Sequence, residues 1–186
     1  MNNITIRKGR REDVPALLDI YNYEVINGTA TFDLQPKTLT ERMQWFEEHQ
    51  TEVHPLLVAE LSPEEPLAPA QQEQADATTL SQPIVAGYAT LSSYRPKEAY
   101  ASTAELSLYI APACRGRGVA TALMQAILQS ARECPELHMV VSVITGGNAA
   151  SIHLHEKFGF SHCGTLREVG FKHGAYRDID HFLLEV

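Results

Sequence analysis

The sequence predicts an α/β fold built as a single domain. Its 186 residues match the usual size of one domain and are enough to bury a hydrophobic core. Hydrophobic residues make up 44% and charged residues 20%, which is typical of a globular chain. Segments with strand periodicity alternate with segments of helical periodicity along the chain. We therefore expect residues 1–186 to form one domain of mixed strands and helices.

The first part of the chain predicts one strand and two helices. Residues 4–7 alternate between apolar and polar side chains, as a strand does. From Asp13 the apolar residues recur at helical spacing: Val14, Leu17, Leu18, Tyr21 and Val25. Thr38 and Glu41 match a capping box, in which each side chain bonds the other's backbone amide, so a second helix should begin there. Its apolar face is predicted to comprise Leu39, Met43 and Phe46.

Residues 56–61 and 84–91 both predict strands, and an unusual segment separates them. Residues 62–82 contain three prolines and a run rich in Gln, Glu, Ala and Thr, with almost no large apolar side chains. Such a segment cannot offset the entropy lost on ordering. We expect a flexible hairpin insertion, with a short helix over residues 71–77 as the alternative.

The second half of the chain begins with a strand of clear alternation over residues 104–110. Leu106, Leu108 and Ile110 share one face, and Glu105, Ser107 and Tyr109 share the other. A helix follows, with apolar residues at helical spacing over residues 119–131. Residues 139–144 are almost continuously apolar, which is typical of a strand buried on both faces.

The chain should end with a helix and a hairpin. The helix runs from about Asn148 to Gly159, and that glycine suits the left-handed conformation that closes many helices. Residues 165–171 and 178–185 predict a β-hairpin around residues 172–174. Lys172 and His173 in this hairpin predict either an anion-binding rim or a solvated turn.

The charge balance argues against a nucleic-acid partner. Fifteen basic and 23 acidic residues give a formal net charge of −8, whereas binding to nucleic acid depends on neutralising phosphates. Arg115 and Arg117 nevertheless form a small basic spot, which suits a compact phosphorylated ligand. The apolar stretches, such as residues 140–144, are far shorter than the roughly 20 residues that cross a bilayer.

The remaining features predict a cytoplasmic protein without a metal. The first residues lack a basic segment followed by an apolar run, so we see no secretory signal. Three widely spaced cysteines predict reduced thiols. His153 and His155 are two residues apart and so lie on different faces of a helix, which is not a metal-ligand spacing.

The strongest local signal for binding is a glycine turn between a strand and a helix, residues 115–120. Gly116 and Gly118 expose backbone amides at a helix N-terminus, where the helix dipole also favours an anion such as a pyrophosphate. Nucleotide hydrolysis is disfavoured because Gly118 is followed by Val119 rather than by Lys-Ser/Thr, and a dinucleotide fingerprint fails at Thr121, where a third glycine should stand. The alternative is a simple glycine-rich connection.

Two motifs resemble the GNAT superfamily of N-acetyltransferases. The segment Cys114-Arg115-Gly116-Arg117-Gly118-Val119-Ala120 fits that family's cofactor loop. The segment from Asn148 to Phe160, Asn-Ala-Ala-Ser-Ile-His-Leu-His-Glu-Lys-Phe-Gly-Phe, is similar to the family's second signature. The resemblance narrows to the phosphinothricin N-acetyltransferase branch through residues 29–33, 94–96, 104–109 and 170–176.

The resemblance implies a mixed, mostly antiparallel twisted sheet with helices on both faces, and acetyl-CoA as co-substrate. Its cofactor should lie where neighbouring strands splay, after Ile110. The pantetheine arm should follow the backbone of Leu108, Tyr109 and Ile110. The pyrophosphate should lie on the loop of residues 115–121: Arg115, Gly116, Arg117, Gly118, Val119, Ala120 and Thr121. Asn148 should reach the arm, and Lys157 the nucleotide end.

The acetylation of an amine requires a base, because a protonated amine cannot attack a thioester and an amino acid's amine is largely protonated at neutral pH. Glu105 is the candidate, acting directly or through water. The alternative is a solvated strand carboxylate. The departing thiolate needs a proton, which His155 or Tyr109 would donate; His155 could equally be a structural histidine.

For the substrate, we expect a small amino-acid-like amine such as phosphinothricin, methionine sulfoximine or methionine sulfone. Arg95 would pair with its carboxylate or phosphinate, and Phe32 and Tyr176 would wall the pocket beside Glu105, unless these aromatic residues belong to the core. The alternatives are acetylation of a polyamine or a protein N-terminus on the same fold, or a module that binds acyl-CoA without catalysis. The resemblance also implies a possible homodimer.

Overall fold

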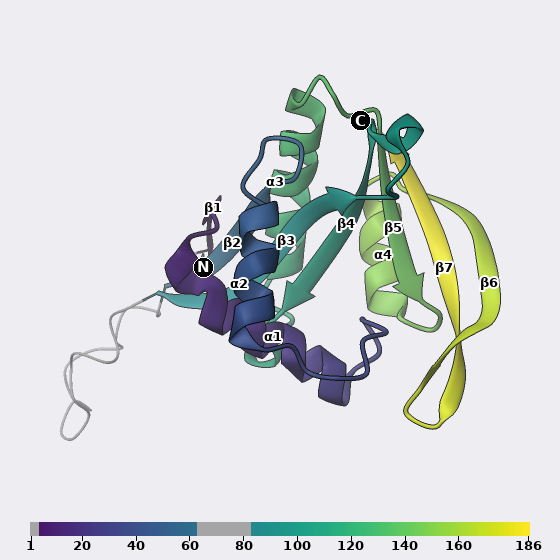
Figure 1. Ribbon diagram of the computed structural model, residues 1–186, viewed down its shortest axis with the longest axis horizontal. Coiled ribbons are helices and arrows are strands. Elements are labelled where there is room, and N and C mark those ends of the chain that lie inside the picture. Colours follow the sequence, from purple (N-terminus) through teal and green to yellow (C-terminus); the bar gives the residue numbers. More distant parts are fainter. Residues whose placement is uncertain (1–3, 63–82) are drawn as a thin grey trace.

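The computed structural model describes residues 4–62 and 83–186, which form one seven-stranded sheet with helices on its two faces (Figure 1). The strand order is β1-β2-β3-β4-β5-β7-β6. The strands are β1 (Ile4–Lys8), β2 (Leu56–Leu61), β3 (Ile84–Ser93), β4 (Thr103–Ile110), β5 (Met139–Thr145), β6 (Ser161–Lys172) and β7 (Ala175–Glu185). The helices are α1 (Val14–Asn27), α2 (Leu39–Glu48), α3 (Val119–Glu133) and α4 (Ala149–Lys157).

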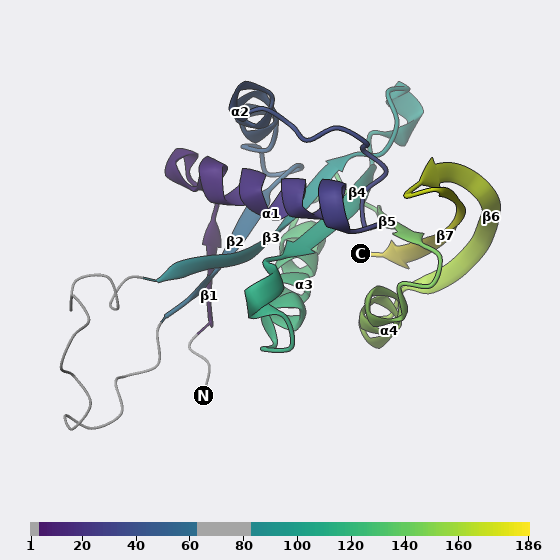
Figure 2. The ribbon, with the colours of Figure 1, turned by 90° about the horizontal axis from the view of Figure 1, so that it is seen from below.

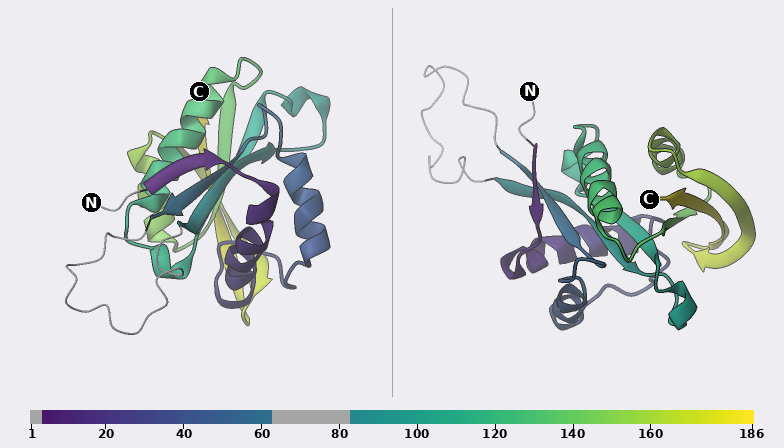
Figure 3. Two further views of the ribbon diagram at one scale, coloured as in Figure 1. Left: turned by 90° about the vertical axis from the view of Figure 1, so that its left-hand side faces the viewer. Right: turned by 90° about the horizontal axis from the view of Figure 1, so that it is seen from above.

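The sheet is mixed and mostly antiparallel, as the resemblance implied. Among the described strands, β4 and β5 are the one parallel pair. Helices α1 and α2 cover one face, and α3 and α4 cover the other (Figures 2 and 3). The larger core lies on the α3 side, around Leu123 and Ile127, and the smaller core on the α1 side, around Leu17 and Phe46. The predicted three-layer α/β fold is therefore confirmed.

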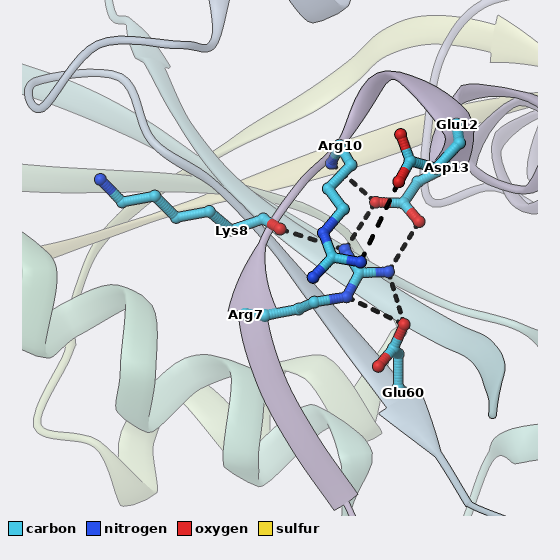
Figure 4. A network of polar contacts seen from close by, with 6 residues as sticks. All are labelled: Arg7, Lys8, Arg10, Glu12, Asp13 and Glu60. Carbon is cyan, nitrogen blue, oxygen red and sulfur yellow. Dashed lines mark hydrogen bonds and ion pairs between the residues drawn. The ribbon is translucent and has the colours of Figure 1, made fainter.

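A charged network holds β1 to β2 and to the start of α1 (Figure 4). The Arg7 guanidinium donates two hydrogen bonds of 2.7 Å to the buried carboxylate of Asp13, and its Nε lies 2.9 Å from Oε1 of Glu60. The Arg10 amide also donates to Asp13, at 2.7 Å. Burial by itself would raise the pKa of Asp13, but these hydrogen bonds and the Arg7 charge hold it below its ordinary value.

The predicted helix ends are confirmed where a specific side chain or glycine marks them. Thr38 caps α2, with its hydroxyl accepting from the Glu41 amide and the Glu41 carboxylate accepting from the Thr38 amide. Gly159 follows α4 with a φ of 89°, the left-handed conformation expected there. Leu39 was wrongly assigned to the apolar face of α2: at the first helical position it is 48% exposed, because the contact with the sheet begins one turn later.

Both predicted hairpins are present, and the second is longer than predicted. Strands β6 and β7 extend to the turn at residues 173–174 on one side and almost to the end of the chain on the other. Strands β2 and β3 are antiparallel neighbours, so the insertion joins two adjacent strands. The prediction that the insertion is flexible concerns residues that lie, from 63 to 82, outside the described part of the chain.

Candidate active site

The candidate site lies where β4 and β5 separate. The two strands pair only over Thr103–Glu105 and Met139–Val141. Beyond that point β4 stays in register with β3 up to Ile110, while β5 stays in register with β7 up to Thr145. Because each strand follows a different neighbour in a twisted sheet, a gap opens between them. The split therefore begins after Glu105, so its predicted position after Ile110 was wrong.

Two connected cavities occupy this gap. The first, which we call the Glu105 cavity, measures about 280 Å³ and is bounded by β4, β5, α4 and the loop that follows α1. The second, the glycine-loop cavity, measures about 530 Å³ and reaches the N-terminus of α3. The two cavities share wall residues, among them Leu108, Tyr109 and Asn148. A long ligand can therefore extend from one cavity into the other.

The glycine-loop cavity brings together most of the predicted cofactor residues. They are Leu108, Tyr109 and Ile110 from β4, Asn148 at the start of α4, and Arg115, Gly116, Gly118, Val119, Ala120 and Thr121 from the loop and first turn of α3. Arg117 is exposed and does not line it. Lys157 lies at the other end of α4 from Asn148 and lines neither cavity.

The glycine loop presents bare backbone at the start of a long helix. Gly116 and Gly118 have φ angles of +74° and +86°, which side-chain-bearing residues rarely adopt. A Cβ atom at Gly116 would meet nothing within 4 Å. Gly118 is the N-cap of α3 and no side chain caps the helix, so the first amides of α3 are open to an anion.

Arg115 fixes the loop from behind. Its guanidinium forms an ion pair with Glu24 of α1, whose side chain is 10% exposed. The same guanidinium lies 5.8 Å from the centroid of the Tyr23 ring, within cation–π range. Arg115 therefore anchors the glycine loop to α1, a role that the sequence did not predict because the partner lies 91 residues away.

Glu105 lies on β4 at the last position where that strand pairs with β5, and its half-buried side chain lines the Glu105 cavity. Burial raises the pKa of its carboxyl above the ordinary value, and the positive charge of Arg95 partly offsets that shift. A carboxylate with a raised pKa is a stronger base than an exposed one.

Tyr109 is two alternations further along the same face of β4 and lines both cavities. Its ring packs against Tyr21 and Tyr88, with centroid separations of 5.4 and 5.3 Å. Burial raises the pKa of the Tyr109 hydroxyl well above its ordinary value, and the neighbouring Tyr88 and Tyr21 add to that shift. The phenol therefore stays protonated at neutral pH.

His155 is buried and both of its ring nitrogens are engaged. Its Nδ1–H donates to the carbonyl of Ser151 at 2.7 Å, since a carbonyl oxygen can only accept. Burial lowers the pKa of the imidazole, so Nε2 carries no proton and accepts from the Ser142 hydroxyl at 2.9 Å. Ser142 was not singled out from the sequence, although a serine inside the apolar run of residues 139–144 was a signal.

The three predicted substrate residues have different positions. Phe32 lines the Glu105 cavity. Arg95 lies outside its wall on the exposed loop after β3, with its guanidinium 5.0 Å from the Tyr94 ring centroid. Tyr176 is 66% exposed and packs against Phe171 at the far end of the β6–β7 hairpin, so this chain does not bring it to the cavity.

Lys172 contradicts both alternatives that the sequence offered for it. It is 2% exposed, so it forms neither an anion-binding rim nor a solvated turn. Its Nζ donates to the carbonyl of Thr31 at 2.7 Å and to that of Glu24 at 3.2 Å. Burial lowers the pKa of its ammonium, and the charges of Glu24 and Asp33 oppose that shift. Lys172 thus holds the loop that carries Phe32.

Replacing Lys172 with methionine is expected to lower the free energy of unfolding by about 2 kcal/mol, because the Thr31 carbonyl would lose its buried donor. Urea denaturation measures this change. The matched control is Lys97→Met at an exposed position, which should shift the free energy by less than about 0.5 kcal/mol. Equal stabilities of the two variants would contradict the assigned role of Lys172.

Two searches of the described residues bear on metals and membranes. Residues 4–62 and 83–186 contain no group of three or more His, Cys, Asp or Glu side chains placed to hold a metal ion. Within the same ranges, no helix combines the length and the apolar character needed to span a bilayer.

Comparison with known proteins yields consistent matches. Residues 23–160 match the Acetyltransferase (GNAT) family. The chain is 38% identical to a phosphinothricin N-acetyltransferase of Streptomyces coelicolor, covering 95% of this chain and 92% of that protein. It is 34% identical to an L-methionine sulfoximine/L-methionine sulfone acetyltransferase of Pseudomonas aeruginosa, covering 98% of this chain and 94% of that protein.

A solved structure is similar over nearly the whole chain. It is a phosphinothricin acetyltransferase of Sinorhizobium meliloti in complex with acetyl-CoA, with a TM-score of 0.83 and 27% identity. The similarity covers 98% of this chain and 88% of that one.

Proposed function

This chain belongs to the Acetyltransferase (GNAT) family, and from that premise we propose that it transfers the acetyl group of acetyl-CoA to the primary amine of a small, amino-acid-like molecule. The observation that carries the proposal is the pair of connected cavities, which places a bare helix N-terminus at one end and a carboxylate with a raised pKa at the other. The proteins of S. coelicolor and P. aeruginosa described above indicate the substrate class: phosphinothricin, methionine sulfoximine or methionine sulfone.

The cleft suits an acetyl-CoA molecule in its chemistry. The diphosphate would be held by the first amides of α3 behind Gly118. The pantetheine amides would bond the edge of β4 over Leu108–Ile110, an edge with which no described strand pairs once β5 has turned away. Asn148 would flank the arm from the start of α4, where its side-chain oxygen accepts from the Ser151 amide at 3.2 Å.

Acetyl-CoA supplies the acetyl group as a thioester, and the residues of this chain manage the protons. Glu105 accepts the proton that the substrate ammonium must lose before it can attack, either directly or through a water molecule. The backbone amide of Tyr109 is the donor proposed to stabilise the negative charge that attack creates on the carbonyl oxygen. The sulfur leaves more readily if a proton reaches it.

Tyr109 is a better donor of that proton than His155. The neutral His155 has its one N–H committed to the Ser151 carbonyl, whereas the Tyr109 phenol stays protonated and lines both cavities. We therefore assign His155 the role of fixing the Ser142 hydroxyl at the cavity wall.

An amino acid fits the Glu105 cavity better than a polyamine does. Among the described wall residues, Glu105 is the one carboxylate, whereas a polyamine with several positive charges would favour several. Arg95 acts on Glu105 electrostatically from the adjacent loop, which is where the substrate's carboxylate or phosphinate would pair with it.

Incubation of the purified protein with acetyl-CoA and each candidate amine tests the proposal. Thiol release should accelerate at least tenfold over the cofactor alone with methionine sulfone, methionine sulfoximine or phosphinothricin, and not with their N-acetylated forms. Spermidine and a peptide with a free N-terminus are the rival acceptors. If only these rivals accelerated release, the substrate class would be wrong; if acetyl-CoA bound and no amine did so, the chain would be a binding module.

We further propose a cytoplasmic homodimer. The three cysteines are free thiols, as in a reducing compartment. The β6–β7 hairpin exposes four large apolar side chains, which is unusual for a surface left in water: Leu166, Val169, Phe171 and Tyr176. Sedimentation at micromolar concentration should give twice the mass of the chain, and a monomer would contradict this assignment.

A further inference from the structure

The Phe32 ring lies directly against Gly170 of β6. A Cβ atom added at Gly170 would be 2.1 Å from Cε2 of Phe32, 2.5 Å from Cδ2 and 3.0 Å from Cζ, whereas ordinary contact begins at 3.4 Å. Gly170 does not have a positive φ, so its backbone would accept a side chain. The glycine is therefore required by the ring alone.

The Phe32 ring lies between Gly170 and the Glu105 cavity, because Phe32 lines that cavity and Gly170 does not. A methyl group at residue 170 would push the ring away from β6 and into the cavity. The cavity measures about 280 Å³, so the space available to a substrate side chain would shrink appreciably.

The loop that carries Phe32 has little freedom to relieve such a push. Four hydrogen bonds hold it to the rest of the chain: Lys172 to the Thr31 carbonyl, Thr145 to the Thr29 carbonyl, His173 to the Gly28 carbonyl, and Tyr21 to the Thr31 hydroxyl. They come from α1, β5 and the β6–β7 hairpin, so the loop is fixed from three sides. The ring must yield before the backbone does.

We infer that Gly170 is a specificity-determining residue, which sets the largest amine side chain that the Glu105 cavity accepts by letting the Phe32 ring lie back against β6. This inference rests on the proposed function and adds to it the residue that limits substrate size. Gly170 itself touches no substrate, since it acts through the position of Phe32.

Gly170→Ala tests the inference with two acceptors, methionine sulfone and the smallest amino acid that the wild type acetylates. For methionine sulfone, kcat/KM should fall about tenfold, as expected when a hydrophobic pocket loses the space of a methylene. For the small acceptor it should fall less than twofold, and the affinity for acetyl-CoA should not change. Val169→Ala, on the exposed face of the same strand, is the control and should alter neither value.

Phe32→Ala provides a second, independent test. This variant should acetylate an amino acid with a larger side chain, such as phenylalanine, relatively better than the wild type does. Gly170→Ala added to Phe32→Ala should cause no further loss, because the ring that it displaces is gone. Should Gly170→Ala not fold, as judged by its thermal unfolding, the change in acceptor preference of Phe32→Ala decides alone.

Three results would overturn the inference: an equal loss with both acceptors in Gly170→Ala, the same loss in the Phe32→Ala background, or an unchanged acceptor preference in Phe32→Ala. These differ from a failure of the proposed function, in which the wild type would bind acetyl-CoA and acetylate no amine; that result would remove both.

Discussion

Replacing Glu105 with glutamine is expected to lower kcat about 1,000-fold, the range in which a general base contributes. Glutamine keeps the shape of the side chain but cannot take a proton from the substrate ammonium. Acetyl-CoA affinity should stay within about twofold, because the carboxylate lies at the end of the cleft away from the glycine loop. Steady-state thiol release and calorimetry measure the two quantities on the same preparation.

The pH profile supplies the signature of that role. Burial raises the pKa of Glu105, so below this value the group is protonated and cannot act as a base. In the wild type kcat/KM should therefore rise with pH as Glu105 loses its proton, and the rise should begin at a higher pH than for an exposed glutamate. Glu105→Gln should lack this limb. Glu98→Gln, at an exposed position, is the matched control; turnover in Glu105→Gln equal to that of the control would remove Glu105 from the mechanism.

Replacing Gly116 with aspartate is expected to weaken the binding of acetyl-CoA about 100-fold. The position is open to solvent, so the side chain fits without a clash, and aspartate tolerates the positive φ better than most residues. Its negative charge would lie next to the proposed diphosphate site, where repulsion between unit charges amounts to a few kcal/mol at an effective dielectric constant of about 20.

Gly116→Asn separates the effect of charge from that of backbone strain. Asparagine has nearly the same shape and the same tolerance of positive φ, so this variant should bind acetyl-CoA within about fivefold of the wild type. Calorimetric dissociation constants for the two variants give the contribution of charge directly. Similar affinities for both would mean that no anion lies at this loop.

The sequence predicted the features of the fold that depend on neighbouring residues. The capping box of Thr38 and Glu41, the closing glycine at position 159 and the alternation on β4 each arise within a few residues, and each is present. The glycine turn was recognisable for the same reason, since its amides need only a local left-handed conformation.

The features that failed depend on residues far apart in the chain. The split between β4 and β5 begins after Glu105 because two strands follow different neighbours, which no local pattern records. Lys172 appeared to be a surface residue of a turn, yet carbonyls of α1 and its following loop accept its hydrogen bonds. The partner of Arg115 and the contact between Gly170 and Phe32 are equally long-range.

Calorimetric titration of the wild-type chain with coenzyme A and with pantetheine measures most directly whether the backbone amides behind Gly118 hold a diphosphate. The two ligands share the thiol arm, and only coenzyme A carries phosphates. We expect coenzyme A to bind one site per chain in the micromolar range, and pantetheine to bind at least about 100-fold more weakly. Equal affinities, or no measurable binding of coenzyme A, would contradict the assignment of this cleft.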